Sequence, residues 1–153
     1  MAVIATLSKY KKTNYKIWIL ILAVAGVWFA YDGFRNENFI KKHTTGGKPD
    51  STLVFHRKSP PYLLAAAAAV VIYYFLVSGK KVVADEQQLI LSEKEKIPYS
   101  SIESINKTNY DSKGYFIIAY KDDAGKTLQK KIDNRNFDNL DAVLDLLVSK
   151  ITG

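Results

Sequence analysis

Two uncharged stretches decide the fold of this chain: residues 17–31, IWILILAVAGVWFAY, and residues 62–77, YLLAAAAAVVIYYFLV. A helix that crosses a bilayer needs about 20 predominantly apolar residues. Each stretch reaches this length when its flanking residues are included, because polar side chains at a helix end, such as Asp32, extend towards the lipid headgroups. We therefore predict two transmembrane helices, over residues 17–34 and 60–79.

Aromatic and basic side chains mark the borders of both predicted helices. Trp and Tyr favour the membrane interface, where the ring lies in an apolar layer and its polar atom is hydrated. The expected interface anchors are Tyr15, Lys16, Trp18, Trp28, Tyr31, Tyr62, Tyr73, Tyr74, Lys80 and Lys81. Neither uncharged stretch contains Asp, Glu, Lys, Arg or His, which argues against a proton relay or an ion path.

Two other interpretations of these stretches are weaker. Two buried helices of a soluble core would have to be apolar on every side, which a chain of 153 residues seldom needs. A cleaved signal peptide fits the lysines of residues 9–16 and the small residues Ala23 and Ala25, but we expect this segment to be retained.

Small residues predict that the two helices pack on each other. Such residues let helix backbones approach closely in lipid, where dispersion contacts replace the hydrophobic effect. The expected packing residues are Gly26, Ala30, Ala65, Ala66 and Ala69. Contact of these residues with another subunit is the alternative.

The net charge of +7 lies entirely in the first half of the chain. Residues 1–79 contain ten basic and three acidic side chains, whereas residues 80–153 contain twelve of each. A nucleic-acid-binding protein is expected to have a basic patch on its folded domain, so the neutral second half argues against nucleic acid as a partner. We predict a basic N-terminal segment over residues 1–16, a polar loop over residues 35–59 and a folded domain over residues 80–153.

Two spans place both ends of the chain on one side of the membrane. Lys and Arg are expected in excess on the cytoplasmic side, but six of them flank the outer ends of the two spans and six lie in the predicted loop. The positive-inside rule therefore does not decide the orientation, and we expect the N-terminus and the C-terminal domain in the cytoplasm.

Short apolar segments alternate with turn residues after Gly79, a pattern typical of antiparallel strands. Strands are predicted over residues 81–84, 88–92, 97–99, 102–108, 115–121 and 126–132. An amphipathic helix follows, with one apolar stripe at helical spacing: Leu140, Val143, Leu144, Leu147, Val148 and Ile151. Asp138 is expected to cap this helix. Its polar face is acidic, which favours packing on the sheet rather than on lipid.

Several short antiparallel strands followed by one C-terminal helix resemble the layout of a pleckstrin-homology-like (PH-like) domain. The segment IPYSSIESI at residues 97–105 is similar to one common in bacterial PH-like domains, which often hang from membrane helices. The stretch AYKD at residues 119–122, with Gly125, Lys126 and the closing helix, is similar as well. The resemblance covers residues 80–153 and implies a small α+β fold, an antiparallel sheet or barrel with a C-terminal helix. The family fold has seven strands, whereas five or six are predicted here.

No set of residues points to catalysis or to a bound cofactor. The chain has no cysteine, which excludes a thiolate nucleophile and a cysteine-based metal centre. His43 and His56 lie in the predicted polar loop with few carboxylates nearby, and we expect them to be ordinary loop residues rather than metal ligands. We therefore predict no enzyme activity, no catalytic residues, no metal site and no cofactor.

Together these features predict a small integral membrane protein that acts as an accessory, structural or assembly subunit of a larger membrane complex. The resemblance implies that its PH-like domain is a protein-interaction platform and that the membrane is the bacterial cytoplasmic (inner) membrane. The alternative is a sensor of anionic lipids or of envelope stress. The expected partners are other membrane protein subunits and the lipid bilayer.

Overall fold

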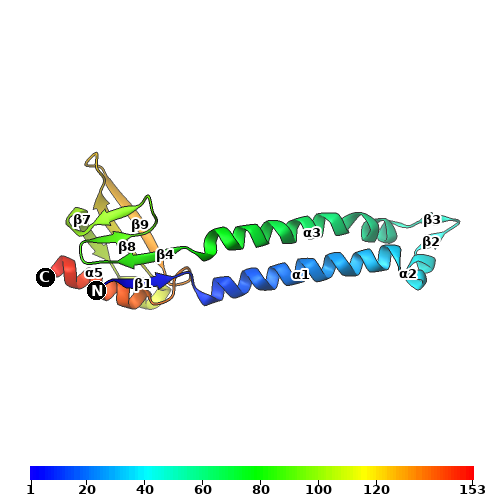
Figure 1. Ribbon diagram of the computed structural model, residues 1–153, viewed down its shortest axis with the longest axis horizontal. Coiled ribbons are helices and arrows are strands. Elements are labelled where there is room, and N and C mark those ends of the chain that lie inside the picture. The colour runs from blue at the N-terminus through cyan, green and yellow to red at the C-terminus, as the bar shows by residue number, and fades with distance from the viewer. The chain divides into compact units, whose positions relative to one another are not determined.

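The computed structural model describes residues 1–153, which form two compact units (Figure 1). One unit is a β-domain made of residues 1–12 and 77–153, and the other is a helical hairpin made of residues 13–76. The chain therefore contributes to the β-domain twice, once before the hairpin and once after it.

The hairpin consists of two long helices that lie side by side, α1 (Lys9–Phe34) and α3 (Ser51–Ser78) (Figure 1). Both are long and apolar enough to cross a membrane, since at the rise of an α-helix they extend for about 39 and about 42 Å. Only 17% of the most apolar window of α1 and 11% of that of α3 are buried. The apolar side chains of these helices are therefore not enclosed by the rest of the chain.

A short connection joins the helices at the tip of the hairpin. Its elements are α2 (Glu37–Lys42), β2 (Thr44–Thr45) and β3 (Lys48–Pro49). Strands β2 and β3 pair across a turn of Gly46 and Gly47, which have φ of +60° and +77°. Glycine adopts this left-handed conformation at no steric cost. The connection covers residues 35–50, so the polar loop predicted over residues 35–59 is too long.

Helix α3 begins well before the span predicted over residues 60–79. Asp50 Oδ1 accepts the N–H of Leu53 at 2.9 Å and so caps the first turn. The helix then continues through Pro60 and Pro61, at the position where the predicted span starts. A proline has no N–H to donate to the carbonyl four residues earlier. Each of these prolines therefore leaves a carbonyl oxygen of α3 without its usual helical hydrogen bond.

Helix α1 also begins earlier than predicted, at Lys9. Ser8 Oγ accepts the N–H of Lys11 at 3.3 Å, and Asp138 Oδ2 accepts the N–H of Lys9 at 2.9 Å. Two side chains thus satisfy N–H groups of the first turn. The prediction that Asp138 caps the C-terminal helix is wrong: the residue before that helix is Asn139, whose side chain makes no capping bond.

The β-domain contains two antiparallel sheets and a C-terminal helix (Figure 1). The first sheet has the order β1-β4-β5-β6, with β1 (Val3–Thr6), β4 (Lys81–Ala84), β5 (Gln88–Ile90) and β6 (Lys96–Pro98). The second has the order β7-β8-β9, with β7 (Ile102–Asn106), β8 (Tyr115–Lys121) and β9 (Thr127–Asp133). The helical elements are η1 (Tyr99–Ser101), α4 (Tyr110–Lys113) and α5 (Leu140–Thr152). All the strands predicted after Gly79 are present, with ends shifted by at most two residues.

The first strand corrects the basic N-terminal segment predicted over residues 1–16. β1 pairs antiparallel with β4, from Val3 opposite Ala84 to Thr6 opposite Lys81. The side chain of Ala5 is completely buried in the domain. The segment is therefore a strand followed by the first two turns of α1, and the β-domain has one strand more than the sequence predicted.

A single hydrophobic core fills the β-domain. Its buried members come from both sheets and from α5: Ala5, Val82, Ala84, Leu89, Ile97, Ile102, Phe116, Ile118, Ile132, Leu140, Val143, Leu144 and Leu147. Val148 and Ile151 pack against this core and are partly buried. The apolar stripe of the C-terminal helix thus lies in or against the core along its whole length.

Candidate functional site

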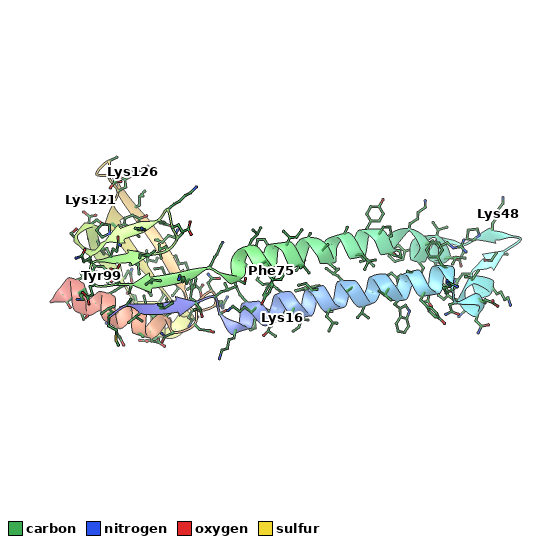
Figure 2. The ribbon with its side chains drawn as sticks, in the orientation of Figure 1. Lys16, Lys48, Phe75, Tyr99, Lys121 and Lys126 are labelled. Carbon is green, nitrogen blue, oxygen red and sulfur yellow. The ribbon has the colours of Figure 1, made fainter.

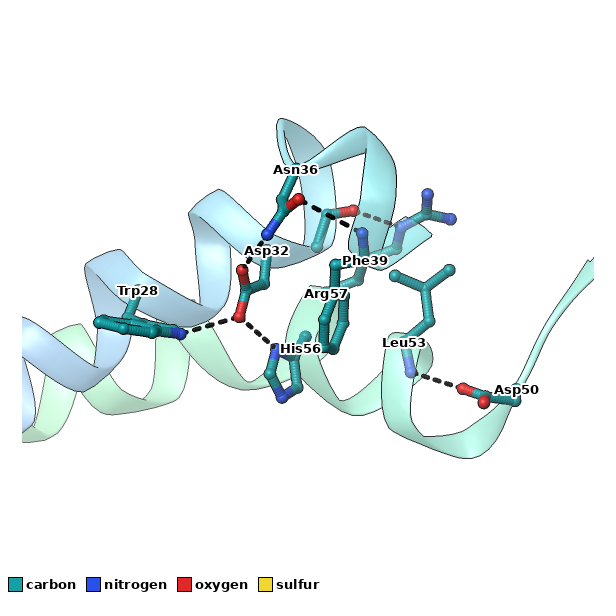
Figure 3. A network of polar contacts seen from close by, with 9 residues as sticks. Trp28, Asp32, Asn36, Phe39, Asp50, Leu53, His56 and Arg57 are labelled. Carbon is teal, nitrogen blue, oxygen red and sulfur yellow. Dashed lines mark hydrogen bonds and ion pairs between the residues drawn. The ribbon is translucent and has the colours of Figure 1, made fainter. Parts of the chain in front are cut away.

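Asp32, near the end of α1, is the buried charged residue of the chain, with 7% of its surface exposed (Figure 3). Burial of a carboxylate is costly unless hydrogen bonds satisfy it. Asp32 Oδ2 accepts the Nε1–H of Trp28 at 2.8 Å, and Asp32 Oδ1 accepts a hydrogen from Asn36 Nδ2 at 2.8 Å. The donors lie four residues before and four residues after Asp32, so helical spacing brings them together. Contrary to the prediction, the side chain of Asp32 does not extend outward from the end of the helix but is held within this cluster.

His56 approaches the same carboxylate from α3. Its Nδ1 lies 3.6 Å from Asp32 Oδ2, and this buried atom has no hydrogen-bond partner. The imidazole ring packs against Phe29 of α1 and Phe39 of α2, with ring centroids 4.4 and 4.6 Å away. His56 thus joins three helices at one point. The prediction that it lies in a polar loop is wrong, because it is part of α3.

A glycine lets the two helices approach closely at the same level. An ideal Cβ on Gly33 would lie only 2.9 Å from the carbonyl oxygen of His56. Pro60 follows that carbonyl by four residues and has no N–H, so the carbonyl lacks its usual helical hydrogen bond. Arg57 Nε donates to the carbonyl oxygen of Gly33 at 2.8 Å, and its guanidinium lies 5.9 Å from the ring centroid of Phe34. Arg57 therefore satisfies one of the free carbonyls at the end of α1.

Side-chain caps order the connection beyond α1. Asn36 Oδ1 accepts the N–H of Phe39 at 3.3 Å and caps α2. His43 Nδ1 lies 2.8 Å from Asp50 Oδ2, on the residue that caps α3. The hydrogen bond from the backbone N–H of Leu53, followed by the bond to His43, lowers the pKa of Asp50. Asp50 is therefore ionised at neutral pH and keeps both contacts.

The outer surface of the tip is basic. Residues 32–58 contain six basic and three acidic side chains, a net charge of +3. Five of the cations are exposed: Arg35, Lys41, Lys42, Lys48 and Lys58. We call these five residues the tip cations, and Figure 2 shows Lys48 at the far end of the hairpin.

The helices do pack on each other, but partly through residues that were not predicted. Gly26 is buried, and an ideal Cβ on it would lie 2.9 Å from Leu64 Cδ2 of α3. Ala30 is half-buried, and the buried alanine of α3 is Ala67. The other predicted packing residues are exposed: Ala65, Ala66 and Ala69. Five consecutive alanines carry no difference in hydrophobicity that would mark the buried face of the helix.

The predicted interface anchors lie on the surface of both units. Tyr15 packs edge-on against Tyr73 and Tyr74, with ring centroids 5.6 and 6.3 Å apart. The exposed anchors of the hairpin are Lys16, Trp18, Trp28, Tyr31, Tyr62 and Tyr73. Lys80 and Lys81 are exposed residues of the β-domain. The position of these side chains at a membrane interface stays a prediction.

Two tyrosines of the β-domain donate hydrogen bonds to oxygens of aspartate residues. Tyr99 Oη donates to the carbonyl oxygen of Asp85 at 2.6 Å, and burial together with the charge of Asp85 raises the pKa of Tyr99 to about 12. Tyr110 Oη donates to Asp141 Oδ1 at 2.7 Å, and burial followed by this bond raises the pKa of Tyr110. Both phenols are therefore neutral hydrogen-bond donors. No group of three His, Cys, Asp or Glu side chains that could hold a metal ion occurs in the chain.

The cluster at the tip is arranged to join helices. Both oxygens of Asp32 accept hydrogen bonds, and aromatic rings cover His56. The contacts that fix the register of α1 against α3 are those of His56 with Asp32 and Phe29 and the hydrogen bond from Arg57 to Gly33. The repeated spacing of Trp28, Asp32 and Asn36 is a signal that could have revealed the cluster in the sequence, whereas His56 has no such signal because its partners lie on other helices.

Comparison with known proteins gave no match to a family model, to a curated protein or to a solved structure. The function is therefore inferred from the residues and the geometry alone.

Proposed function

We propose that this chain is a small integral membrane protein that acts as an accessory, structural or assembly subunit, and that its hairpin packs against another membrane subunit. The proposal rests on the exposure of one face of α3, which α1 does not cover. Four exposed residues at helical spacing line this face: Ala65, Ala69, Ile72 and Leu76. Because α1 does not cover the two alanines, a further helix can approach closely at this face in lipid.

Large exposed apolar side chains support the membrane location of both helices. Leu20 of α1 is 63% exposed, and Leu76 of α3 is 72% exposed. Soluble monomers rarely expose contiguous apolar patches of more than a few hundred Å². In a bilayer the same surface needs no protein to cover it, because lipid tails are as apolar as leucine.

The pairing of β1 with β4 supports a two-span topology. These strands precede α1 and follow α3 in the chain, and they are neighbours in one sheet. Both outer ends of the hairpin are therefore tied to the same folded domain, which requires them to lie on one side of the membrane. We place this domain on the cytoplasmic side of a bacterial inner membrane.

For the β-domain we propose a PH-like fold and a role as a protein-interaction platform. Its support is a count of seven strands in two antiparallel sheets with a closing helix, the number of strands in the family fold. Strand β9 has seven residues and pairs only with β8. Its outer edge thus has free backbone groups that an extended segment of a partner can pair with.

Photo-crosslinking from single cysteines tests the subunit proposal, because the chain has no cysteine of its own. The variants Ala65→Cys and Ala69→Cys would each carry a photoreactive maleimide on the exposed face of α3 in native membranes. We expect both to form a crosslinked product of one defined size with another membrane protein. Ala67→Cys is the matched control, since Ala67 is buried in the hairpin, and it should give no such product.

Extraction of the membranes at alkaline pH tests the membrane location separately. An integral hairpin stays in the pellet after this treatment, because its apolar surface remains in lipid. Release of the protein into the supernatant would contradict the transmembrane proposal. Recovery as a lone monomer in mild detergent, with no crosslinked product from Ala65→Cys or Ala69→Cys, would contradict the subunit proposal.

A further inference from the structure

The tip cations are exposed and mostly free of ion pairs. Lys41 lies 3.7 Å from Glu37, but both side chains are more than three-quarters exposed, and such pairs contribute little. The other four, Arg35, Lys42, Lys48 and Lys58, form no ion pair. Asp50, the second acidic residue of the connection, is engaged by the cap of α3 and by His43. The positive charge of the tip is therefore presented to the outside.

Several lysines of the β-domain, unlike most of the tip cations, form ion pairs. Lys130 Nζ lies 2.8 Å from Glu95, Lys121 Nζ lies 3.2 Å from Glu103, and equal numbers of basic and acidic residues follow Gly79. These lysines are neutralised by carboxylates of the same domain. Of the two surfaces, the tip of the hairpin is therefore the one that attracts anions.

The tip cations also lie at the right level along the hairpin for lipid headgroups. Exposed aromatic rings lie at this end of both helices: Trp28, Tyr31 and Phe34 on α1, and Phe55 on α3. Such rings mark the boundary between hydrocarbon and headgroups, and the headgroup layer continues for roughly 5–8 Å beyond it. Arg35, Lys41, Lys42 and Lys48 follow the ring of Phe34 directly in the chain, so these four cations fall in this layer. Lys58 lies about one turn after Phe55 in α3 and reaches the layer with its long side chain.

The tip is held in shape before any ligand binds. Asn36 caps α2, Asp50 caps α3, and the turn of Gly46 and Gly47 closes β2 on β3. Ordering of a loop on binding costs free energy, and here the backbone is already ordered by its own hydrogen bonds. A set of cations on a fixed backbone binds a layer of phosphates with little further ordering.

We propose that the tip of the hairpin binds the headgroups of anionic phospholipids through Arg35, Lys41, Lys42, Lys48 and Lys58. The inference rests on the proposed membrane location of the helices, and it assigns lipid recognition to the tip rather than to the β-domain. Phosphate groups are the ligands, and each lysine or arginine near a charged membrane surface adds to the attraction. The preference falls as salt is added, because the charges are exposed.

The two tryptophans of the chain, Trp18 and Trp28, allow a direct test with the full-length protein. In the Trp18→Phe variant the remaining Trp28 reports on lipid at the tip. The protein would be placed in bilayers of phosphatidylcholine and phosphatidylglycerol, with one or the other lipid brominated so that it quenches fluorescence on contact. We expect phosphatidylglycerol to be enriched about threefold around Trp28 over its share in the bilayer.

Neutral variants locate the charges responsible. Lys41→Gln, Lys42→Gln and Lys48→Gln together should abolish the enrichment, and the three Lys→Arg replacements should keep it. The control removes the same charge from exposed lysines of the β-domain, Lys107, Lys113 and Lys126, and should leave the enrichment unchanged. Circular dichroism of each variant would show that the helices remain folded.

Two results would overturn the proposal in distinguishable ways. Equal quenching of Trp28 by both brominated lipids, or loss of the enrichment with the β-domain control, would refute lipid recognition by the tip and leave the membrane location intact. Absence of quenching by brominated phosphatidylcholine as well would show that the hairpin is not in the bilayer, and would refute both proposals.

Discussion

The β-domain buries many large side chains completely, among them Phe116, Leu89 and Ile118, whereas the hairpin completely buries one large side chain, Leu53. Its other buried residues include Gly26, Gly33, Ala67 and the carboxylate of Asp32. The first pattern is that of a core formed in water, where burial of apolar area is the main stabilising term. In the second, close backbone approach and a few polar contacts hold two apolar helices together, as expected in lipid. The hairpin therefore depends on fit at single positions, whereas the β-domain depends on buried volume.

The largest expected effect comes from the β-domain core. Phe116→Ala removes a fully buried ring and should lower the free energy of unfolding by about 3–5 kcal/mol. Hydrogen exchange read by mass spectrometry would show faster exchange in β8 and its neighbours. Leu20→Ala is the matched change in the hairpin: Leu20 is 63% exposed, and exchange in both units should stay as in the parent protein.

Glycine replacement in the hairpin should have the next largest effect. Gly33→Ala places a methyl group 2.9 Å from the backbone oxygen of His56, and such overpacking costs about 1–3 kcal/mol. Thermal unfolding in detergent, followed by helical circular dichroism, would measure the loss. Gly26→Ala meets the end of the Leu64 side chain at a similar distance, and that side chain can rotate away. An equal loss for both variants would contradict the role assigned to the backbone contact of Gly33.

Removal of the buried carboxylate should have a somewhat smaller effect. Asp32→Ala leaves the N–H groups of Trp28 and Asn36 without their acceptor, at a cost of about 1–2 kcal/mol in lipid. The same thermal measurement checks this, together with a shift in the fluorescence of Trp28. Asp32→Asn keeps one acceptor oxygen and should lie between the parent and Asp32→Ala; a loss as large as that of Asp32→Ala would show that the charge of Asp32, not its hydrogen bonding, is what matters.

The smallest effect concerns the pH dependence of the β-domain. Hydrogen bonds from the backbone N–H groups of Gln87 and Gln88 lower the pKa of Asp85 below 3.8. Since the folded pKa is lower than the unfolded one, this stabilisation is present above about pH 4 and is lost as the pH falls below that value. Denaturant unfolding between pH 7 and about pH 3 should show a smaller decline for Asp85→Asn than for the parent. A parallel decline would show that other carboxylates account for the pH dependence.

Local patterns made much of this fold predictable. The strands after Gly79 alternate with turn residues, and the stripe from Leu140 to Ile151 has helical spacing, so each element carries its own signal. The two long helices were predicted from their apolar length. Their first turns were missed, because the caps at Ser8 and Asp50 lie before polar residues that looked like loop.

The remaining features depend on contacts between distant parts of the chain. β1 has only four residues, and its partner strand begins at Lys81, so nothing nearby marks it as part of a sheet. His56 belongs to the site because α1 and α2 bring Phe29 and Phe39 to it. Ala67 is buried and the alanines beside it are exposed. A run of five alanines has no sequence signal that would distinguish the buried one. Tertiary packing, rather than propensity, decided these positions.

The strand order of the first sheet has a consequence for biosynthesis. β1 leaves the ribosome before both long helices, and β4, the strand that it pairs with, leaves after them. During translation, residues 3–6 therefore have no partner strand until about 70 further residues have been made, as in any fold whose closing contacts are far apart in sequence. The first sheet of the β-domain can thus close only after both helices of the hairpin have been synthesised.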